Sequence, residues 1–465
     1  MGKFKMPTAF TILFGIILAM ILLTWIVPAG QYNYTGSGEP VAGSYHRVEQ
    51  SAQPITALVT APIQGLYEGI DIAAFILMVG GFLGVVAKTG AIDAGIIHII
   101  RKLKGRESLL IPILMCAFAL GGTTFGMSEE TIAFYPLVLP IMIAAGYDNI
   151  TAVAVIMLGA GVGTLGSTVN PFATGIASGF AGISLGSGIL LRLVILLVLL
   201  GLTIWFVMRY AARVKADHSR SIMEDRRSDY ITHFSTLDQE EEKPLTGKQK
   251  LALIIFALTF LVMIYSVIPF DEMGLPLPAL GWWFPELSAL FLAASIVLGL
   301  LCRLPELDTV TSFVSGAAEL LGVAFIIGVS RGITVVMNAG KITDTILNAG
   351  EGVLTGVSSL LFVLLTYVIY LPLSFLIPSS SGLATLSMPI MAPLADFSGV
   401  DRALVITAFQ SASGLINLIT PTSAVVMGAL AIGRVPYDRW LKFVWKLILI
   451  LLVGSLVLLA AGAIL

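Results

Sequence analysis

The feature that most constrains this chain is an apolar run, 121–172, that polar and helix-breaking residues interrupt twice. The interruptions are MSEET at 127–131 and GSTVNP at 166–171. The core of a bilayer holds no water for exposed backbone groups, so a broken helix survives there only where protein or a wet cavity surrounds it. Ionised side chains at that depth are costly and usually functional. The run therefore predicts a buried polar site inside a membrane protein.

The same double interruption recurs in the second half of the chain. It reads IPSSSG at 377–382 and LITPTS at 418–423. Broken apolar segments at matching places in two halves point to a transporter's binding site. We therefore expect an all-α polytopic membrane protein with two inverted repeats. Each repeat would contain a re-entrant helical hairpin and a broken helix, the arrangement of an elevator-type carrier.

Composition agrees with a membrane protein. Of 465 residues, 57% are hydrophobic and 12% are charged, whereas soluble domains carry about 25% charged residues. Cys116 and Cys302 lie in apolar runs without metal-ligand spacing, and we expect both to be buried and no metal site or other cofactor to be present. The chain contains no Gly-x-x-x-x-Gly-Lys-Ser/Thr sequence for ATP. A non-enzymatic protein driven by gradients or by exchange is therefore expected.

Hydropathy and charge divide the chain into five parts. We expect a first transmembrane helix with an external loop, repeat 1, a cytoplasmic linker, connecting helices and repeat 2, at 1–53, 54–209, 210–250, 251–303 and 304–465. The hairpins are expected at about 108–146 and 358–397, and the broken helices at about 150–183 and 403–433. Because charges dominate the linker, it is predicted to be a solvated tether.

Lysine and arginine set the expected orientation. Lys3 and Lys5 place the N-terminus in the cytoplasm by the positive-inside rule, and the basic loops 101–106 and 434–446 are expected on the same side. Counting spans through the two repeats then puts the C-terminus outside. The chain is predicted to be a multi-pass protein of the bacterial cytoplasmic membrane.

Hydroxyl, amide and carboxylate groups gather at the four interruptions. Helix N-termini there would present N–H groups to a carboxylate, and unwound carbonyls and hydroxyls would bind Na⁺. For any single hydroxyl the alternative is a bond back to its own helix. A coupling Na⁺ or H⁺ is expected, with Na⁺ near Asn170 and Asn417. The candidate substrate- and ion-binding residues are Ser128, Glu129, Glu130, Thr131, Ser167, Thr168, Asn170, Pro171, Arg331, Pro378, Ser379, Ser380, Ser381, Gly382, Asn417, Thr420, Pro421, Thr422 and Ser423.

The charged candidates suggest opposite roles. Glu129 or Glu130 would neutralise a cationic substrate group, hold the coupling ion or carry a proton. The alternative is that both acids cap the second arm of the hairpin. Arg331 lies deep in an apolar run, and its planar guanidinium suits a carboxylate. For Arg331 the alternative is a structural pairing with Glu319 or with a helix-end carbonyl.

Four blocks of sequence, at 6–32, 126–148, 166–183 and 373–396, resemble the C4-dicarboxylate anaerobic carrier family in its YfcC-like branch. The resemblance implies the ion-transporter superfamily, with inverted repeats and a moving transport domain. Some related members carry dicarboxylates, and others exchange basic amino acids such as arginine for ornithine. Dicarboxylate carriers of the superfamily have Ser-Asn-Thr at their hairpin tips. The tips here read Ser128-Glu129-Glu130-Thr131 and Ser379-Ser380-Ser381-Gly382, and two acids at a tip would repel a dianion.

We therefore expect a secondary active transporter for a small carboxylate-bearing solute, working by alternating access. An amino acid is the preferred solute, with arginine/ornithine-type exchange as the example. The alternatives are a C4-dicarboxylate carrier coupled to Na⁺ or H⁺ and, from another class, a channel. Expected partners are the lipid bilayer and a second copy of the chain in a homodimer, and no nucleic acid.

Overall fold

The computed structural model describes residues 9–36, 40–41, 43–92, 94–95, 106–234, 245–267, 270, 277–354 and 356–464. Over these residues the chain is helical apart from one small antiparallel sheet of β1 (Gly30–Gln31) and β2 (His46–Arg47). Nine helices of this part are long and apolar enough to cross a membrane. The expectation of an all-helical polytopic protein is confirmed. Lys3, Lys5, the loop 101–105 and the linker's end at 235–244 lie outside the described residues.

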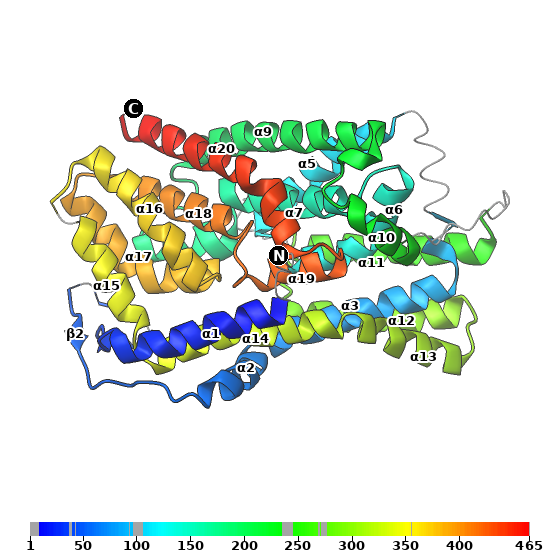
Figure 1. Ribbon diagram of the computed structural model, residues 1–465, viewed down its shortest axis with the longest axis horizontal. Helices are drawn as coiled ribbons and strands as arrows, with labels where there is room; N and C mark the ends of the chain where they lie inside the picture. The colour runs from blue at the N-terminus through cyan, green and yellow to red at the C-terminus, as the bar shows by residue number, and fades with distance from the viewer. Residues whose placement is uncertain are drawn as a thin grey trace, which may run out of the picture.

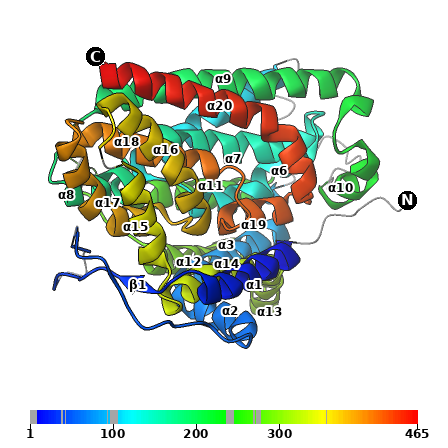
Figure 2. The ribbon, with the colours of Figure 1, turned by 60° about the vertical axis from the view of Figure 1, so that its left-hand side comes forward.

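The helices form two layers, seen in Figures 1 and 2. The lower layer contains α1 (Ala9–Ile26), α2 (Ala57–Glu68), α3 (Ile70–Lys88), α12 (Phe284–Leu301), α13 (Glu306–Glu319) and α14 (Leu321–Ala339), with α11 (Gly247–Val267) packed on α12. Its packing is reciprocal: α1 and α2 lie against α14, while α12 and α13 lie against α3. Helices from the two halves of the chain therefore interlock in this layer.

Glycines allow the close approach of the lower-layer helices. A Cβ on Gly80 would lie 2.6 Å from the Gly316 carbonyl oxygen, and a Cβ on Gly316 would lie 2.3 Å from that of Gly80. A Cβ on Gly65 would be equally close, at 2.3 Å, to the Gly328 carbonyl oxygen. In a bilayer, lipid tails are as apolar as the helices, so helices associate mainly through such tight packing of small residues.

The upper layer contains the two interrupted regions. From the first half it takes η1 (Glu107–Leu109), α5 (Leu110–Phe125), η2 (Glu129–Phe134), α6 (Tyr135–Ala144), α7 (Asn149–Gly166), η3 (Pro171–Gly175), α8 (Ile176–Ala181) and α9 (Ile189–Ala216). From the second half it takes α16 (Ser359–Leu376), α17 (Ser380–Phe397), α18 (Arg402–Ile416), α19 (Ala424–Ile432) and α20 (Tyr437–Ile464). Helix α15 (Thr343–Leu354) joins α14 to α16. Packing is again reciprocal, since α5 lies on α7, α16 lies on α18, and α7 meets α18.

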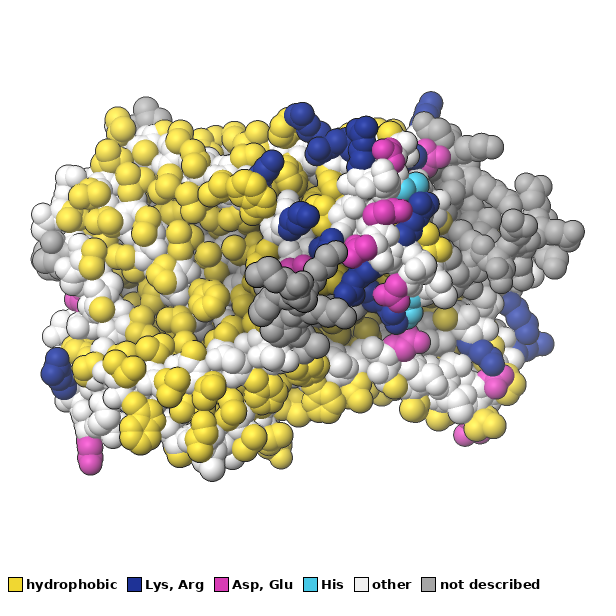
Figure 3. Space-filling model, viewed as in Figure 1, with side chains coloured by type: hydrophobic (Ala, Val, Ile, Leu, Met, Phe, Trp, Pro, Cys, Tyr) yellow, Lys and Arg dark blue, Asp and Glu magenta, His cyan; other side chains and the backbone are white. Residues whose placement is uncertain are grey.

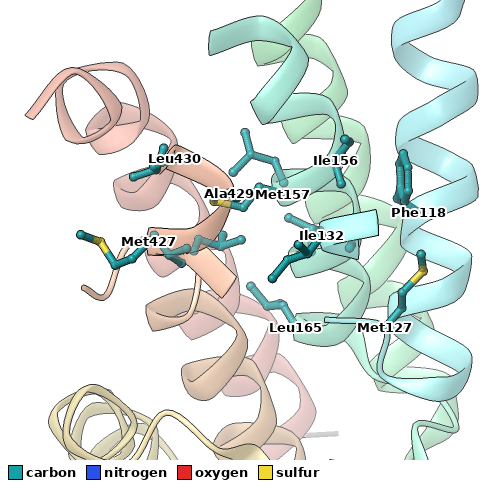
Figure 4. Close-up of a cluster of buried hydrophobic side chains, with 14 of the residues drawn as sticks. Phe118, Met127, Ile132, Ile156, Met157, Leu165, Met427, Ala429 and Leu430 are labelled. Carbon is teal, nitrogen blue, oxygen red and sulfur yellow. The ribbon is translucent and has the colours of Figure 1, made fainter. Parts of the chain in front are cut away.

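Burial separates the centre of the upper layer from its rim. In α7, 89% of the residues are buried. In the most apolar stretches of α9 and α20, 28% of the residues are buried. Figure 4 shows Met127, Ile132 and Leu165 packed in one apolar cluster with Met427 and Leu430, so both halves share this core. Helices α9 and α20 cover the outer face of the layer, away from the lower layer (Figure 1).

The predicted tether at 210–250 is ordered over its first part, which corrects that expectation. Beyond α9 the chain forms η4 (His218–Arg220), η5 (Glu224–Arg226) and α10 (Arg227–Phe234). Met223, Tyr230 and Phe234 are buried there, and ion pairs join this segment to Arg434 and Arg439. These three residues are seven and four positions apart, a helical spacing, but so few apolar residues among many charges did not indicate a packed segment.

Two more residues differ from the sequence expectations. Cys302 is buried as expected, but Cys116 is exposed on α5. An apolar run is typical both of helices that face lipid and of helices that face protein, so it does not predict which side a residue takes. The sequence analysis also missed Arg192, which is 1% exposed and donates through Nη2 to the carbonyl oxygens of Leu185 and Ser187, at 2.6 and 2.9 Å.

Asp148 anchors the ordered linker to the upper layer. It is fully buried as the N-cap of α7. Its carboxylate accepts hydrogen bonds from Thr151 N at 3.0 Å, from Tyr210 Oη at 2.7 Å and from Ser221 Oγ. A buried carboxylate is costly unless hydrogen bonds satisfy it. These bonds therefore hold α7, α9 and the linker together.

We expect Asp148→Asn to lower the free energy of unfolding by about 1–3 kcal/mol, because an amide nitrogen leaves buried donors unpaired. Thermal unfolding of the detergent-solubilised protein would show this as a fall in Tm. Asp401→Asn is the matched control, since Asp401 caps α18 but is exposed, and we expect it to cost at most about 1 kcal/mol. Equal shifts for the two variants would contradict the anchoring role of Asp148.

Candidate functional site

A cavity of about 170 Å³ lies between the two layers, where the helix breaks and the hairpin tips meet. This size fits a small solute. Phe172 of the upper layer and Trp283, which precedes α12 of the lower layer, contact each other beside it, with ring centroids 4.7 Å apart. The lower layer contributes Ile72, Trp283, Phe284, Ile327, Ser330, Arg331 and Thr334 to the lining.

The structure brings most of the residues predicted for the site into one lining, although they come from five separate stretches. These are Ser128, Glu129, Glu130, Asn170, Arg331, Pro378, Ser379, Ser380, Ser381, Asn417, Thr422 and Ser423. Within the described part of the chain, six others are not part of the lining: Thr131, Ser167, Thr168, Gly382, Thr420 and Pro421. Pro171 begins η3. The sequence analysis missed the lining residues Gly126, Thr164, Ser330, Thr334, Gln410 and Ser413.

At the first break, side-chain hydroxyl groups form hydrogen bonds with backbone groups that the interrupted helix leaves unpaired. Thr168 N donates to Thr123 Oγ1 at 2.9 Å, and Val169 N donates to the Thr123 carbonyl oxygen at 3.2 Å. Thr174 Oγ1 donates to the carbonyl oxygen of Ser167, which has a left-handed φ of 38°. Buried backbone groups are nearly always paired. The hydroxyls of Thr123 and Thr174 therefore stabilise the break.

Asn170 is held by the helix that follows it. Its Oδ1 accepts hydrogen bonds from Phe172 N at 2.9 Å and from Ala173 N at 3.3 Å. Gly126, at the end of α5, has a φ of 74°, and a Cβ there would lie 2.5 Å from Asn170 Oδ1. Only glycine lets the hairpin approach this amide so closely. Because two backbone N–H groups already occupy the oxygen, Asn170 is poorly suited to bind a cation.

Asn417 at the second break differs from Asn170. Its Nδ2 donates to the Pro378 carbonyl oxygen at 3.1 Å, whereas its Oδ1 is buried without a hydrogen-bond partner in the described chain. Gln410 repeats this pattern: its Nε2 donates to the Thr164 carbonyl oxygen, and its Oε1 is buried and unpaired among the described residues. Buried polar atoms are normally hydrogen-bonded. Both residues line the cavity, so their oxygens fit a cation or a ligand N–H group.

The second hairpin tip presents a helix N-terminus. Ser379 is the N-cap of α17, and its Oγ accepts from Gly382 N at 3.2 Å. Ser380 and Ser381 form the first turn and also line the cavity. The free N–H groups of a first helical turn favour a negative charge. This side of the cavity suits a carboxylate.

Polar contacts also cross between the layers at the second break. Thr422 Oγ1 donates to the Phe375 carbonyl oxygen at 2.6 Å within the upper layer. The carbonyl oxygen of Thr422 accepts from Ser330 Oγ, which belongs to α14 of the lower layer. This hydrogen bond joins the two layers beside the packing of α14 on α19.

The charged residues described in the lining are Glu129, Glu130 and Arg331. Glu130 is 6% exposed, and its Oε2 accepts from Ser128 N at 3.0 Å, so Glu130 makes a capping contact of the kind that the alternative assigned to both acids. Within the described part of the chain, the side chains of Glu129 and Arg331 form no hydrogen bond or ion pair. The alternative pairing of Arg331 with Glu319 is not formed. With all three groups ionised, the lining carries a formal charge of −1.

Comparison with known proteins shows that the chain as a whole matches a family of carriers. The C4-dicarboxylate anaerobic carrier family, DcuC, matches residues 6–463. An uncharacterized protein of Haemophilus influenzae is 36% identical, over 98% of this chain and 96% of its own. A protein of Escherichia coli named as a candidate basic amino acid antiporter, YfcC, is 32% identical, over 99% of this chain and 97% of its own.

Two solved transporter structures show weak similarity over most of the chain. YdaH of Alcanivorax borkumensis has a TM-score of 0.43 at 15% identity, over 98% of each chain. MtrF of Neisseria gonorrhoeae, described as illuminating a class of antimetabolite efflux pumps, has a TM-score of 0.42 at 16% identity, over 98% of this chain and 95% of its own.

Proposed function

We propose that this chain, which belongs to the C4-dicarboxylate anaerobic carrier family of membrane transporters, is a secondary active carrier that exchanges basic amino acids. The observation that carries the proposal is the charge of the cavity. With all three groups ionised, Glu129, Glu130 and Arg331 give the lining a formal charge of −1. Arginine, lysine and ornithine each carry a net charge of +1 at neutral pH and would make the loaded site neutral. A dicarboxylate would instead bring it to −3.

Charge balance matters here because the cavity lies within a membrane protein. An uncompensated charge in a medium of low dielectric constant costs several kcal/mol, and a group in that position tends to find a partner or lose its charge. A monocationic solute satisfies the cavity without any change of protonation. A neutral amino acid or a dianion would need extra protons or Na⁺ ions to reach the same balance.

Each end of a basic amino acid has suitable partners in the lining. Glu129 and Glu130 would bind a cationic group, with the unpaired oxygen of Gln410 as a further acceptor. The first turn of α17, at Ser380 and Ser381, would bind the carboxylate through its N–H groups. Asn417 Oδ1 would take a coupling Na⁺ or a donor of the solute. The Asn170 oxygen fits Na⁺ less well because it is already bonded.

The relatives support two solutes. YfcC, at 32% identity over nearly the whole chain, is named for basic amino acid antiport, which agrees with the charge balance. The family description names C4-dicarboxylates, and Arg331 is the observation that favours them, since a guanidinium binds a carboxylate well. A C4-dicarboxylate carrier coupled to Na⁺ or H⁺ is therefore the second candidate.

For the transport cycle we propose an elevator mechanism in two inverted repeats. The upper layer, with both hairpins and both broken helices, would carry the solute past the lower layer. Support comes from the reciprocal packing of the two halves and from the position of the cavity between the layers. The lower layer would provide the contact between subunits of a homodimer.

The orientation of the chain is also a proposal. Figure 3 shows Lys and Arg side chains gathered at the end of the molecule that carries α10, while the rest of that face is largely apolar. The positive-inside rule makes this end cytoplasmic. The C-terminal end of α20 lies at the opposite end (Figure 1). The last residues would then be external.

A reporter at the C-terminus tests the orientation. Green fluorescent protein fused after residue 465 should be dark, and alkaline phosphatase fused there should be active, because the external side is oxidising. The same two reporters fused after residue 5 provide the comparison, with green fluorescent protein bright at a cytoplasmic N-terminus. A bright fusion at the C-terminus would refute the inverted arrangement of the repeats.

Ligand-induced thermal stabilisation of the purified protein tests the solute. We expect arginine, ornithine and lysine to raise Tm, and succinate to leave it unchanged, with each measured in the presence and absence of Na⁺. Glu129→Gln and Glu130→Gln should each weaken arginine binding by about ten- to a hundredfold, the loss expected for a hydrogen bond to a charged group. Glu129→Gln should still fold and should lower the unliganded Tm only slightly, because this side chain makes no hydrogen bond in the described chain.

Glu306→Gln is the control, since Glu306 is exposed at the start of α13 and far from the cavity lining in sequence. It should bind arginine like the wild type. Stabilisation by succinate but not by arginine, with binding unchanged in both Gln variants, would contradict basic amino acid exchange and support the dicarboxylate candidate.

A further inference from the structure

We infer that Arg331 is a fixed counter-charge for Glu129 and Glu130, which holds the upper layer in place until a cationic solute occupies the acids. The inference rests on the proposed function and adds a reason for strict exchange. The three residues line one cavity but belong to two layers. Arg331 would therefore stay with the lower layer and act as a positioning residue for the upper, moving layer, without travelling with the solute.

Arg331 is anchored in the lower layer. It lies on α14, where that helix touches α2. A Cβ on Gly65 would lie 2.9 Å from the Arg331 carbonyl carbon, and a Cβ on Gly69 would lie 3.5 Å from Arg331 Cγ. Both the backbone and the stem of this arginine are thus packed against α2. Only the guanidinium end is left to reach the cavity.

The two acids belong to the other layer. Glu129 and Glu130 begin η2, between α5 and α6. The η2 turn packs on α6, α7 and α19 of the upper layer and also touches α3 of the lower layer, and Glu130 is tied to Ser128 by its hydrogen bond. Any sliding of the layers would separate the acids from Arg331. The charge attraction between them therefore opposes movement.

The solute changes this balance. Without it, Arg331 on the lower layer is the cation that the described lining offers to the two carboxylates, and moving the layers would increase the distance between opposite charges at membrane depth. A basic amino acid brings its own cationic groups to the acids and weakens the hold of Arg331. Solutes without a surplus positive charge cannot replace Arg331 as the counter-charge of the acids. The unloaded carrier is consequently kept from crossing, which is the condition for obligatory exchange.

Arg331 as the ligand of the solute's carboxylate is the competing role. A residue that binds the solute throughout transport must move with it, whereas Arg331 is packed in the lower layer. The two roles also differ in their response to agmatine, which is arginine without its carboxylate. A carboxylate ligand would matter for arginine and not for agmatine. A counter-charge affects both alike.

The test compares exchange with uptake into empty vesicles. Purified protein is reconstituted into liposomes that contain either arginine or buffer alone, and entry of labelled arginine is measured. The wild type should take up arginine rapidly against internal arginine and slowly against buffer. Arg331→Gln should raise uptake against buffer by about tenfold, which corresponds to about 1.4 kcal/mol of lost charge pairing. Arg331→Lys keeps the charge and should remain a strict exchanger.

Two further variants complete the design. Glu129→Gln removes one of the charges that Arg331 holds, so at saturating arginine it should show the same increase in uptake against buffer. It also provides a readout if Arg331→Gln does not fold, as judged by its Tm. Arg209→Gln makes the same substitution at an exposed position on α9 and should behave like the wild type.

Strict exchange in both Arg331→Gln and Glu129→Gln would overturn the inference. So would a loss of arginine affinity in Arg331→Gln with agmatine affinity unchanged, since that result identifies a carboxylate ligand. Failure of the proposed function would look different. In that case the wild type would not exchange arginine in either kind of vesicle.

Discussion

The unpaired backbone groups at two helix breaks impose the central arrangement of this protein. A bilayer offers them no water, so neighbouring segments must supply the hydrogen bonds. Thr123 supplies them at the first break from the adjoining hairpin arm. At the second break Tyr437 and Trp440, at the start of α20, donate to the carbonyl oxygens of Ile419 and Leu418. These bonds hold the hairpins, the breaks and the flanking helices together in the upper layer. The cavity lies where this layer faces the lower layer.

The two halves use similar backbones for different chemistry. The first hairpin tip places two acids in the cavity, and the second places the N-terminus of α17 there. One asparagine oxygen, in Asn170, is bonded to the backbone, while the other, in Asn417, is unpaired within the described chain. The two halves of the chain thus line the cavity with acids at one hairpin tip and a helix N-terminus at the other. Such a site matches an amino acid better than a symmetric dianion.

The sequence predicted the helical class and the segments that meet, because breaks in apolar runs have a strong physical cause. It did not predict which hydroxyls face the cavity, since the Ser167 hydroxyl pairs with that of Thr174 and the Thr168 hydroxyl donates to the Thr123 carbonyl oxygen. Nor could hydropathy distinguish a position that faces outward, such as Cys116, from one that packs against protein. It also did not reveal the packing of Met223 and Tyr230 in the linker. Those features depend on tertiary contacts that no local pattern records.

Disulfide trapping tests most directly whether the upper layer moves past the lower one. A Cβ on Gly428 of α19 would lie 4.0 Å from Val323 Cβ of α14, within the range of about 3.5–4.5 Å that suits a disulfide. With Cys116 and Cys302 replaced, oxidation of Gly428→Cys/Val323→Cys should abolish arginine exchange, and reduction should restore it. The pair Gly299→Cys/Thr309→Cys, both within the lower layer, should crosslink without effect. Full crosslinking between the layers with undiminished exchange would contradict the account.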